Sequence, residues 1–519
     1  MHSDFIVLLN PTGRVLLGTD GMPTERKHCT PPLGLAYLAS NLRMAGFGVS
    51  VIDSLAEGYD NERKVDNFIF YGLDDKEIIN RINKISPKIV GISILFSNLA
   101  SEALRLARII KKNNSNIKIV LGGHHPSSMP ERIMRDHEYI DYILVGEADN
   151  TLVNLCESTQ LKNSDLFHIK GLFWRDNHGS IINNDKKLSS EYKGIDFQYF
   201  SKKNSPNPNL LDSLPLPAWD LFPMESYWST NVRLGASDTF KTKYSVMVST
   251  RGCPHICDFC TSPLMGGFKN YRKRTNQDVI DEILFMKEKY GIEEIQFLDD
   301  NFFVSRLRVK ELLKLIADQC KGMLFSVPAG TEANTLDEEI ISLLSKAGFY
   351  KITLAIESGN AEIQSARIDK NVDLAKIPIT ISLLRKYGLE IRAFFMIGFP
   401  GESKESILNT ANYALSLDLD DFAISVVTPL PGTPLFDEAL NKNLLSSDFD
   451  PNDIRYSVSS IKIEGMTSEE IENVRILTWK KHQDKIRKNK KNIKFKSHFE
   501  FSSAGFTSLD VNSPKTETI

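Results

Sequence analysis

The stretch Tyr244-Ser-Val-Met-Val-Ser-Thr-Arg-Gly-Cys-Pro-His-Ile-Cys-Asp-Phe-Cys260 runs from an apolar strand pattern directly into three cysteines. These are Cys253, Cys257 and Cys260, with the spacing C-x3-C-x2-C. Three thiolates this close together can bind three irons of a cubane [4Fe–4S] cluster and leave the fourth iron open to a ligand. The alternatives are free thiols or a structural zinc site, but zinc needs a fourth ligand at a typical spacing, and His255 lies inside the loop. The spacing therefore predicts a cluster whose open iron takes part in chemistry.

Strand and helix patterns alternate through residues 244–440, outward from this motif. Six successive strand–helix units predict a partial (β/α)6 barrel of the TIM type, and barrel enzymes carry their chemistry in loops at the carboxyl ends of strands. The cysteines follow the first strand, as that rule requires. The predicted strands are Tyr244–Thr250, Glu294–Asp300, Leu324–Gly330, Lys351–Glu357, Ile391–Gly398 and Phe422–Pro429.

Residues 1–160 show the same alternation, with shorter units. Short apolar strands separated by helical patterns predict an α/β, doubly wound (Rossmann-like) domain with a parallel sheet. Ligands of such folds bind at the carboxyl ends of the strands. The predicted strands are Phe5–Leu9, Val49–Asp53, Ile89–Leu95, Ile117–Leu121 and Ile140–Val145, with helices over Leu33–Ala45, Lys76–Ile85, Glu102–Lys112 and Pro130–Asp136.

The remaining segments connect or extend these two domains. Residues 161–243 are rich in Asn, Ser, Asp, Lys and Pro and are interpreted as a linker, with a hairpin over 171–182 and Trp219 docked on a neighbour. Residues 441–498 are predicted to be helical, and Lys480 to Lys496 contain nine Lys or Arg. We interpret that run as a solvated helix, with a phosphate or lipid surface as the alternative. Residues 499–519, rich in Ser, Thr and Asn, are predicted to be disordered.

Composition narrows the class of protein. The chain has 519 residues, is 41% apolar and 25% charged, and has a net charge of −3, which gives no indication of nucleic-acid binding. No apolar run approaches the ~20 residues that span a bilayer, and no secretory signal is visible. The three cysteines outside the motif, Cys29, Cys156 and Cys320, are scattered, so a disulfide framework is not expected. A reducing cytoplasm fits this pattern and an oxygen-sensitive cluster.

The cysteine spacing resembles the signature of the radical S-adenosylmethionine (SAM) enzymes. In that superfamily the open iron chelates the amino and carboxylate groups of SAM, and one electron cleaves SAM to a 5′-deoxyadenosyl radical. An electron donor such as flavodoxin or ferredoxin is implied. Polar or glycine-containing turns end the second, fourth and fifth strands, as in the family. The resemblance implies SAM-binding roles for Phe259, Asp299, Glu357, Ser358 and Gly398.

Two of these assignments, and two arginines nearby, have alternatives. Phe259 could be an ordinary core residue, and the acidic cluster at Asp299 could cap a helix. Arg272 and Arg274 follow the cysteine loop and could pair with the SAM carboxylate or a substrate phosphate, or simply be exposed to solvent.

The doubly wound domain resembles the cobalamin-binding domain of cobalamin-dependent radical SAM enzymes. The match rests on the helix opening Pro31-Pro32-Leu-Gly34, the turn Gly122-Gly123-His124-His125 and the turn Gly146-Glu147. It covers residues 4–440. The chain has no Asp-x-His-x-x-Gly motif, so the resemblance implies base-off cobalamin without a protein His ligand, and His124 and His125 lie in the wrong turn for that role. The implied cobalamin-binding residues are Pro32, Gly34, Ser97, Gly122, Gly123, His124, Gly146 and Glu147.

The resemblance implies a methyltransferase that acts on a small molecule. Methylcobalamin would donate a methyl group to an unactivated carbon or phosphorus centre after hydrogen abstraction by the deoxyadenosyl radical. The alternative is a cobalamin-dependent cyclase or rearrangement enzyme, such as the anaerobic cyclase of the chlorophyll ring. A tRNA methylthiotransferase needs three further cysteines in its first domain, where this chain has only Cys29 and Cys156. A non-catalytic cobalamin sensor needs neither the three cysteines nor the strand-end motifs.

Overall fold

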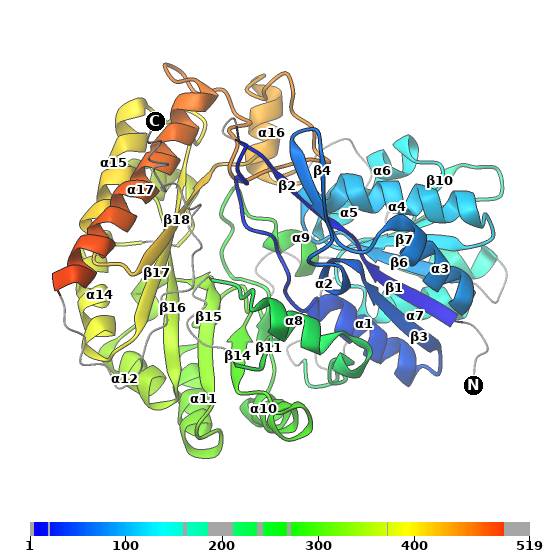
Figure 1. The fold of residues 1–519 in the computed structure, drawn as a ribbon, viewed down its shortest axis with the longest axis horizontal. Coiled ribbons are helices and arrows are strands. Elements are labelled where there is room, and N and C mark those ends of the chain that lie inside the picture. The colour runs from blue at the N-terminus through cyan, green and yellow to red at the C-terminus, as the bar shows by residue number, and fades with distance from the viewer. Residues whose placement is uncertain are drawn as a thin grey trace, which may run out of the picture.

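The computed structural model describes residues 5–18, 21–158, 163–184, 211–235, 242–266, 271–370 and 372–492. Two α/β units lie side by side, the first drawn in blue to cyan and the second in green to yellow in Figure 1. The predicted tail 499–519, and residues 493–496 of the basic run, lie outside the described residues. No described helix is long and apolar enough to span a membrane. The predicted cytoplasmic location stays a prediction.

The first unit confirms the doubly wound prediction. Its parallel strands have the order β3-β1-β6-β7-β8. Most residues of β1 and β6 are buried, which explains their continuous apolar runs, because such strands are covered on both faces. The strands are β1 (Phe5–Asn10), β3 (Gly48–Asp53), β6 (Ile89–Ser93), β7 (Lys118–Gly122) and β8 (Tyr142–Leu144). The main helices are α1 (Leu33–Met44), α3 (Asp75–Ile85), α4 (Ala100–Asn113), α6 (Pro130–Asp136) and α7 (Asp149–Ser158).

Two features of the first unit differ from the sequence interpretation. The hairpin predicted within the linker forms as β9 (Leu172–Arg175) and β10 (Ile181–Asn183), but β9 pairs antiparallel with β8 and so extends the first sheet. A separate antiparallel sheet, β2 (Gly13–Leu16), β5 (Phe68–Tyr71) and β4 (Glu62–Val65), was not predicted. Every residue of β4 is exposed, so this strand lacks the apolar alternation that reveals half-buried strands.

The second unit confirms the partial barrel. Six parallel strands follow one another in chain order, and β11 and β18 are the two edges of the described sheet. The strands are β11 (Tyr244–Met247), β14 (Glu294–Phe297), β15 (Leu324–Thr331), β16 (Phe349–Glu357), β17 (Glu390–Ile397) and β18 (Asp421–Val426). The helices outside them are α10 (Asn276–Tyr290), α11 (Arg306–Gln319), α12 (Glu338–Lys346), α14 (Ile377–Lys386) and α15 (Lys404–Ser416), as Figure 1 shows.

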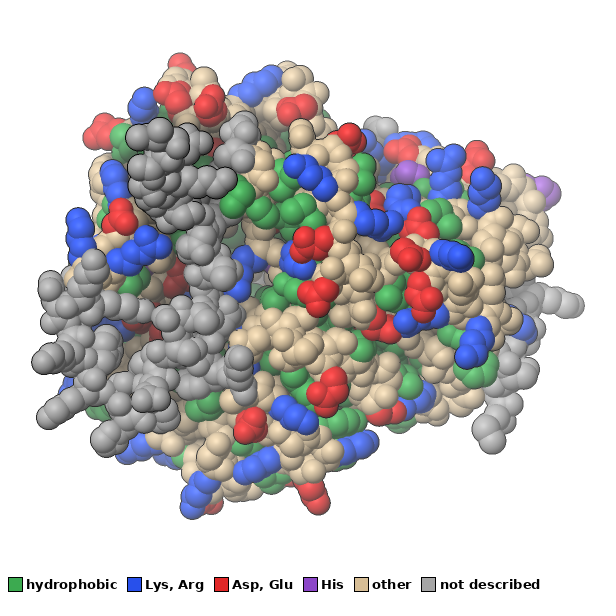
Figure 2. Space-filling model, in the orientation of Figure 1, with side chains coloured by type: hydrophobic (Ala, Val, Ile, Leu, Met, Phe, Trp, Pro, Cys, Tyr) green, Lys and Arg blue, Asp and Glu red, His purple; other side chains and the backbone are tan. Residues whose placement is uncertain are grey.

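The C-terminal region, predicted to be helical over 441–498, is helical after Asn441 only from Ser468 onward among the described residues. Helix α16 (Pro434–Asn441) precedes it, and α17 (Ser468–Asn492) packs against α15 and β18. Residues 442–467 between them form turns and isolated bridges rather than helix. Within the basic run, Lys485 donates from Nζ to the carbonyl oxygens of Leu415 and Leu417, so part of this run binds the barrel. Over the coloured part of the face in Figure 2, positive and negative side chains are interspersed.

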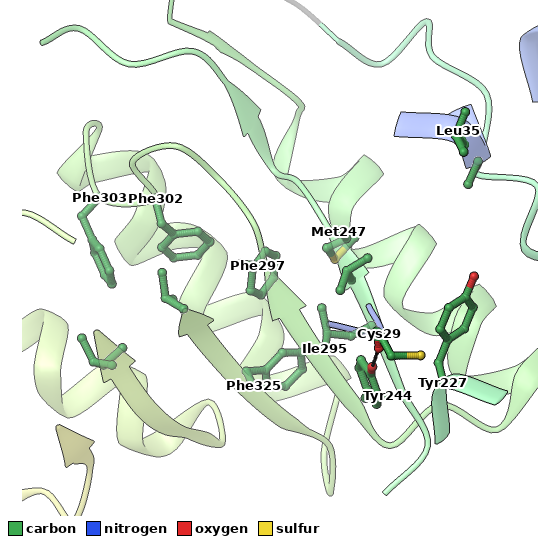
Figure 3. Packing of buried hydrophobic residues seen from close by; sticks show 14 of the residues in the cluster. Cys29, Leu35, Tyr227, Tyr244, Met247, Ile295, Phe297, Phe302, Phe303 and Phe325 are labelled. Atoms are coloured by element: carbon green, nitrogen blue, oxygen red, sulfur yellow. Dashed lines mark hydrogen bonds between the residues drawn. The ribbon is translucent and has the colours of Figure 1, made fainter. Parts of the chain in front are cut away.

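The two units share one hydrophobic core. Tyr244 on β11 is fully buried, and its hydroxyl lies 3.4 Å from the carbonyl oxygen of Cys29, which belongs to the first unit (Figure 3). Phe297 and Phe325 extend this cluster into the barrel. Trp219 of the linker is also buried and lies next to a backbone hydrogen bond from Ala218 to α1, which confirms its predicted docking. The relative placement of the two units is therefore fixed by buried contacts.

Candidate active site between the two units

The cysteine loop joins β12 (Thr250–Arg251) to α9 (Ser262–Gly266) at the carboxyl edge of the barrel. Acidic side chains from other segments of the barrel form hydrogen bonds with this loop. Each contact ties the loop to a separate segment, so its position is defined by the barrel. The contacts are from Gly252 N–H to Asp300 (3.0 Å), from Ile256 N–H to Asp369 (3.0 Å) and between His255 Nε2 and Glu332 (3.0 Å).

The three thiols lie in a protected environment. Cys257 is buried, and Cys253 and Cys260 are half-buried. Burial raises the pKa of each thiol to about 11, while Lys370 acts in the opposite direction at all three. Among the described residues, no three or more His, Cys, Asp or Glu side chains are arranged to hold a metal ion. A cubane needs no such convergence because each thiolate binds a different iron, so the loop fits a cluster better than zinc.

Glu357 at the end of β16 forms the most conspicuous polar contact near the cysteines. Its backbone has a φ of 67°, a left-handed conformation that is costly for a residue with a side chain. Its carboxylate lies 2.6 Å from Nζ of Lys370. Burial lowers the pKa of Lys370, but Glu357 and the thiols of Cys257 and Cys260 outweigh it, so the pKa is raised and the amine is charged. Sequence reasoning found Glu357 but missed Lys370, which lies in a loop without a recognisable pattern.

Two predicted SAM-binding residues are buried and have hydrogen-bond partners within the barrel. Asp299 is fully buried and accepts hydrogen bonds from the hydroxyls of Ser249 (2.7 Å) and Thr250 (2.5 Å). Ser358 is also fully buried, with its hydroxyl 3.1 Å from that of Thr410. Both side chains therefore support strand ends, and their contact with SAM stays a prediction. Asp300 is the exposed carboxylate beside Asp299.

Phe259 lies against the turn that follows β17, and the SAM-binding roles of Phe259 and Gly398 stay predictions. Gly398 has a φ of 91°, and its N–H and that of Phe399 both donate to the carboxylate of Glu402, at 2.8 and 3.0 Å. The ring of Phe259 meets Phe399 edge to face, with centroids 6.0 Å apart. The cysteine loop is thus packed, through Phe259, against the residue that follows this glycine.

The carboxyl edge of the first sheet has room and apolar surface. Leu95 and Phe96, which follow β6, are 48% and 44% exposed. A β-carbon added at Gly34 or Gly122 would meet nothing within 4 Å. Pro32 precedes α1, and the hydroxyl of Ser97 lies 3.0 Å from Nδ1 of His125. Apolar surface beside uncrowded glycines fits a broad, flat ligand such as a corrin ring.

The predicted cobalamin-binding turns also contact the second unit. Nδ1 of His124 lies 3.3 Å from the hydroxyl of Thr261, directly after the third cysteine. A β-carbon at Gly146 would lie 3.1 Å from the carbonyl oxygen of Met265 on α9. Short helix α5 (His124–Ser128) packs against α9. The carboxyl edge of the first sheet therefore faces the cysteine loop.

Three charged residues that the sequence offered as ligand contacts have ion-pair partners in the protein, two of them across this interface. Glu147 binds Arg272 and lies 3.4 Å from Arg251, so its carboxylate joins the two units, and its contact with cobalamin stays a prediction. Arg272 is accordingly unavailable for the SAM carboxylate. Arg274 is occupied as well, since it binds Asp278 and Glu282 on α10. The sequence identified Glu147 as a polar residue at a strand end, but it did not reveal that its partners are arginines of the other unit.

Comparison with known proteins identifies the class that this fold and site define. Residues 21–156 match the B12 binding domain model, and residues 247–414 match the radical SAM superfamily model. The chain belongs to the radical SAM enzymes that carry an N-terminal cobalamin-binding domain. Members of this class use a [4Fe–4S] cluster, SAM and cobalamin, and the edges described above fit all three.

Particular relatives share most of the chain. An uncharacterised methyltransferase of Pyrococcus horikoshii is 32% identical over 85% of this chain and 85% of its own. Cytidylyl-2-hydroxyethylphosphonate methyltransferase of Streptomyces wedmorensis is 29% identical over 89% and 86%. An anaerobic magnesium-protoporphyrin IX monomethyl ester cyclase of Rubrivivax gelatinosus is 23% identical over 79% and 67%.

The fold has been seen before in a solved structure. The radical SAM methyltransferase TsrM from Kitasatospora setae, determined with cobalamin and a [4Fe–4S] cluster bound, superposes with a TM-score of 0.65. It is 18% identical, and the match covers 91% of this chain and 84% of that one. The similarity therefore extends over both units and their relative placement.

Proposed function

We propose that this chain is a cobalamin-dependent radical SAM methyltransferase that transfers a methyl group to an unactivated carbon or phosphorus centre of a small molecule. One observation carries the proposal: the carboxyl edges of the two sheets face each other, with His124 against Thr261 at the cysteine loop. A radical source and a methyl donor must reach the same substrate atom, so both must open on one space. The methyltransferase relatives support the choice of reaction.

The residues at the two sheet edges have different roles in this proposal. When bound, the cluster with SAM supplies a radical that removes a hydrogen atom, and methylcobalamin supplies the methyl group. Cys253, Cys257 and Cys260 hold the cluster. Glu357 and Lys370 form a carboxylate–ammonium pair that matches the ammonium and carboxylate of the methionine part of SAM. Phe259 and the Gly398 turn enclose the adenosine part and keep water out.

Lys370→Met is expected to weaken SAM binding about 10- to 100-fold, because a hydrogen bond to a charged group contributes about 1.5–3 kcal/mol. Lys370→Arg keeps the charge and should lose less. Calorimetric titration of the cluster-reconstituted protein with SAM measures the effect. The matched control is Lys376→Met, whose exposed amine pairs with Asp373 on the same segment. Wild-type affinity in Lys370→Met would remove Lys370 from the SAM site.

The electron donor has an accessible approach beside the cysteine loop. Ile256, between two of the cysteines, is 45% exposed and lines an open pocket of about 870 Å³ together with Asp258, residues 364–369 and residues 372–375. A small reductase of the flavodoxin or ferredoxin type that contacts Ile256 lies one side chain away from the cluster. We place the electron donor there and the small-molecule substrate on the side of the first unit.

The test of the function uses SAM with a deuterated methyl group under anaerobic, reducing conditions. The first candidate substrates are cytidylylated phosphonates, because a relative is named for one. The expected product carries one labelled methyl group and forms together with 5′-deoxyadenosine. A product altered in any other way, by ring closure or rearrangement, favours the alternative cyclase function. The similarity to a cyclase is the observation behind that alternative.

A further inference from the structure

We propose that the imidazole of His28 binds the cobalt of cobalamin on the face turned toward the first unit. This inference rests on the proposed function and goes beyond it. The expectation of cobalamin without a protein His ligand came from the absence of one sequence motif. The structure places a different histidine, outside any such motif, at the edge where the corrin is expected.

His28 lies in the long connection that leads from β1 to α1. Both elements meet the carboxyl edge of the first sheet, because β1 ends there and α1 begins there. In doubly wound folds, this edge is where ligands bind. The connection reaches this edge at Phe96, whose ring lies against that of His28.

The backbone around His28 is held on both sides. The N–H of His28 donates to the hydroxyl of Tyr71 at 2.9 Å, and Tyr71 is buried at the end of β5. Nζ of Lys27 donates to the carbonyl oxygen of Tyr59 at 2.8 Å, and Cys29 is fully buried. The small sheet that the sequence did not reveal thus fixes this connection. Such anchoring presents the side chain between the anchors in a defined position.

The imidazole of His28 is left available by these contacts. The side chain is exposed, and neither ring nitrogen has a hydrogen-bond partner among the described residues. Its ring stacks loosely on Phe96, with centroids 6.5 Å apart and planes 26° apart. Phe96 follows β6, so the pair spans two loops of the carboxyl edge. An unpartnered imidazole beside exposed apolar surface matches a metal at the centre of an apolar macrocycle.

The other histidines at this edge have partners. His124 lies against Thr261. His125 is buried, with its two ring nitrogens 3.0 Å from the hydroxyl of Ser97 and 3.2 Å from the side-chain oxygen of Asn452. These contacts hold both rings in structural positions. His28 is the histidine of this edge that a cofactor can reach without breaking a contact.

The connection also contacts the C-terminal region. Glu25, three residues before His28, lies 3.1 Å from Arg455 in the C-terminal region. The next residue, Tyr456, is 41% exposed. The connection that carries His28 is therefore also tied to the C-terminal region. A histidine on the side of the first unit leaves the other face of the corrin, where the methyl group must lie, open toward the substrate.

The experiment is electron paramagnetic resonance of the full chain loaded with cob(II)alamin, prepared with unlabelled and with 15N-histidine-labelled protein. An axial nitrogen splits the cobalt(II) lines into triplets for 14N and doublets for 15N. We expect doublets in labelled wild-type protein, and loss of this splitting in His28→Gln with cobalamin still bound. The control is His178→Gln, in the exposed hairpin turn, which should retain the doublets.

Each outcome decides the assignment. Triplets that labelling does not change identify the cofactor's own base as the ligand and overturn the proposal. Absence of nitrogen splitting in wild-type protein, or doublets that persist in His28→Gln, overturn it as well. In these cases bound cobalamin leaves the proposed function intact. A wild-type chain that takes up no corrinoid removes the proposed function and the assignment of His28 together.

Discussion

Cys257→Ala is expected to abolish the formation of 5′-deoxyadenosine from SAM under reducing conditions. Cys257 is the buried member of the three cysteines, and alanine leaves one iron of the cubane without a protein ligand. The wild-type chain should bind about four irons after anaerobic reconstitution and show a cluster signal that changes on addition of SAM. The variant should lose iron and that signal. Iron analysis, electron paramagnetic resonance and chromatography of the deoxyadenosine product measure the three effects.

The matched control is Cys320→Ala. Cys320 is equally buried but lies at the end of α11, outside the loop. This variant should retain the iron content and the SAM cleavage of the wild type. Deoxyadenosine formation by Cys257→Ala at the wild-type rate would contradict the assignment of the three cysteines as cluster ligands.

Gly123→Ala is expected to lower the free energy of unfolding by about 2–5 kcal/mol, through backbone strain and overpacking together. Gly123 has a φ of 110°, and a β-carbon there would lie 2.5 Å from the carbonyl oxygen of Ile94. That oxygen already accepts the N–H of His125, so it has no freedom to move aside. The turn after β7 should therefore deform, and cobalamin binding should fall with it. Thermal unfolding without cobalamin measures the first effect, and the corrinoid absorption bands measure the second.

The neighbouring glycine separates folding from binding. Gly122→Ala adds a methyl group where nothing lies within 4 Å, so its unfolding should match that of the wild type. If the corrin covers this edge, the same methyl group should weaken cobalamin binding. Equal stability of Gly123→Ala and Gly122→Ala would show that the turn is not constrained as described.

The strands were predictable because burial on both faces makes them continuous apolar runs. The residues of β1, β6 and β11 are covered by helices or the other unit, and their sequences show it without further context. The exposed strand β4 has no such pattern and was missed. The cysteines were predictable because their spacing is local.

The polar residues of the site were only partly predictable. Asp299, Ser358 and Glu147 were recognised as strand-end residues. The direction of each side chain depends on the conformation of the turn that follows the strand, which the sequence does not reveal. Lys370 and His28 carry no local pattern, because their significance depends on neighbours distant in the sequence. Such pairs form through tertiary contacts that one sequence does not reveal.

The core that joins Tyr244 to Cys29 makes the two units a single cooperative body. Splitting the chain between them would expose aromatic surface on both fragments, so neither half is expected to work as an independent module. We therefore expect little hinge motion between its halves. We expect the distance between the two cofactor sites to be fixed by the fold. A molecule would then be accepted as a substrate only if its reactive atom fits between them.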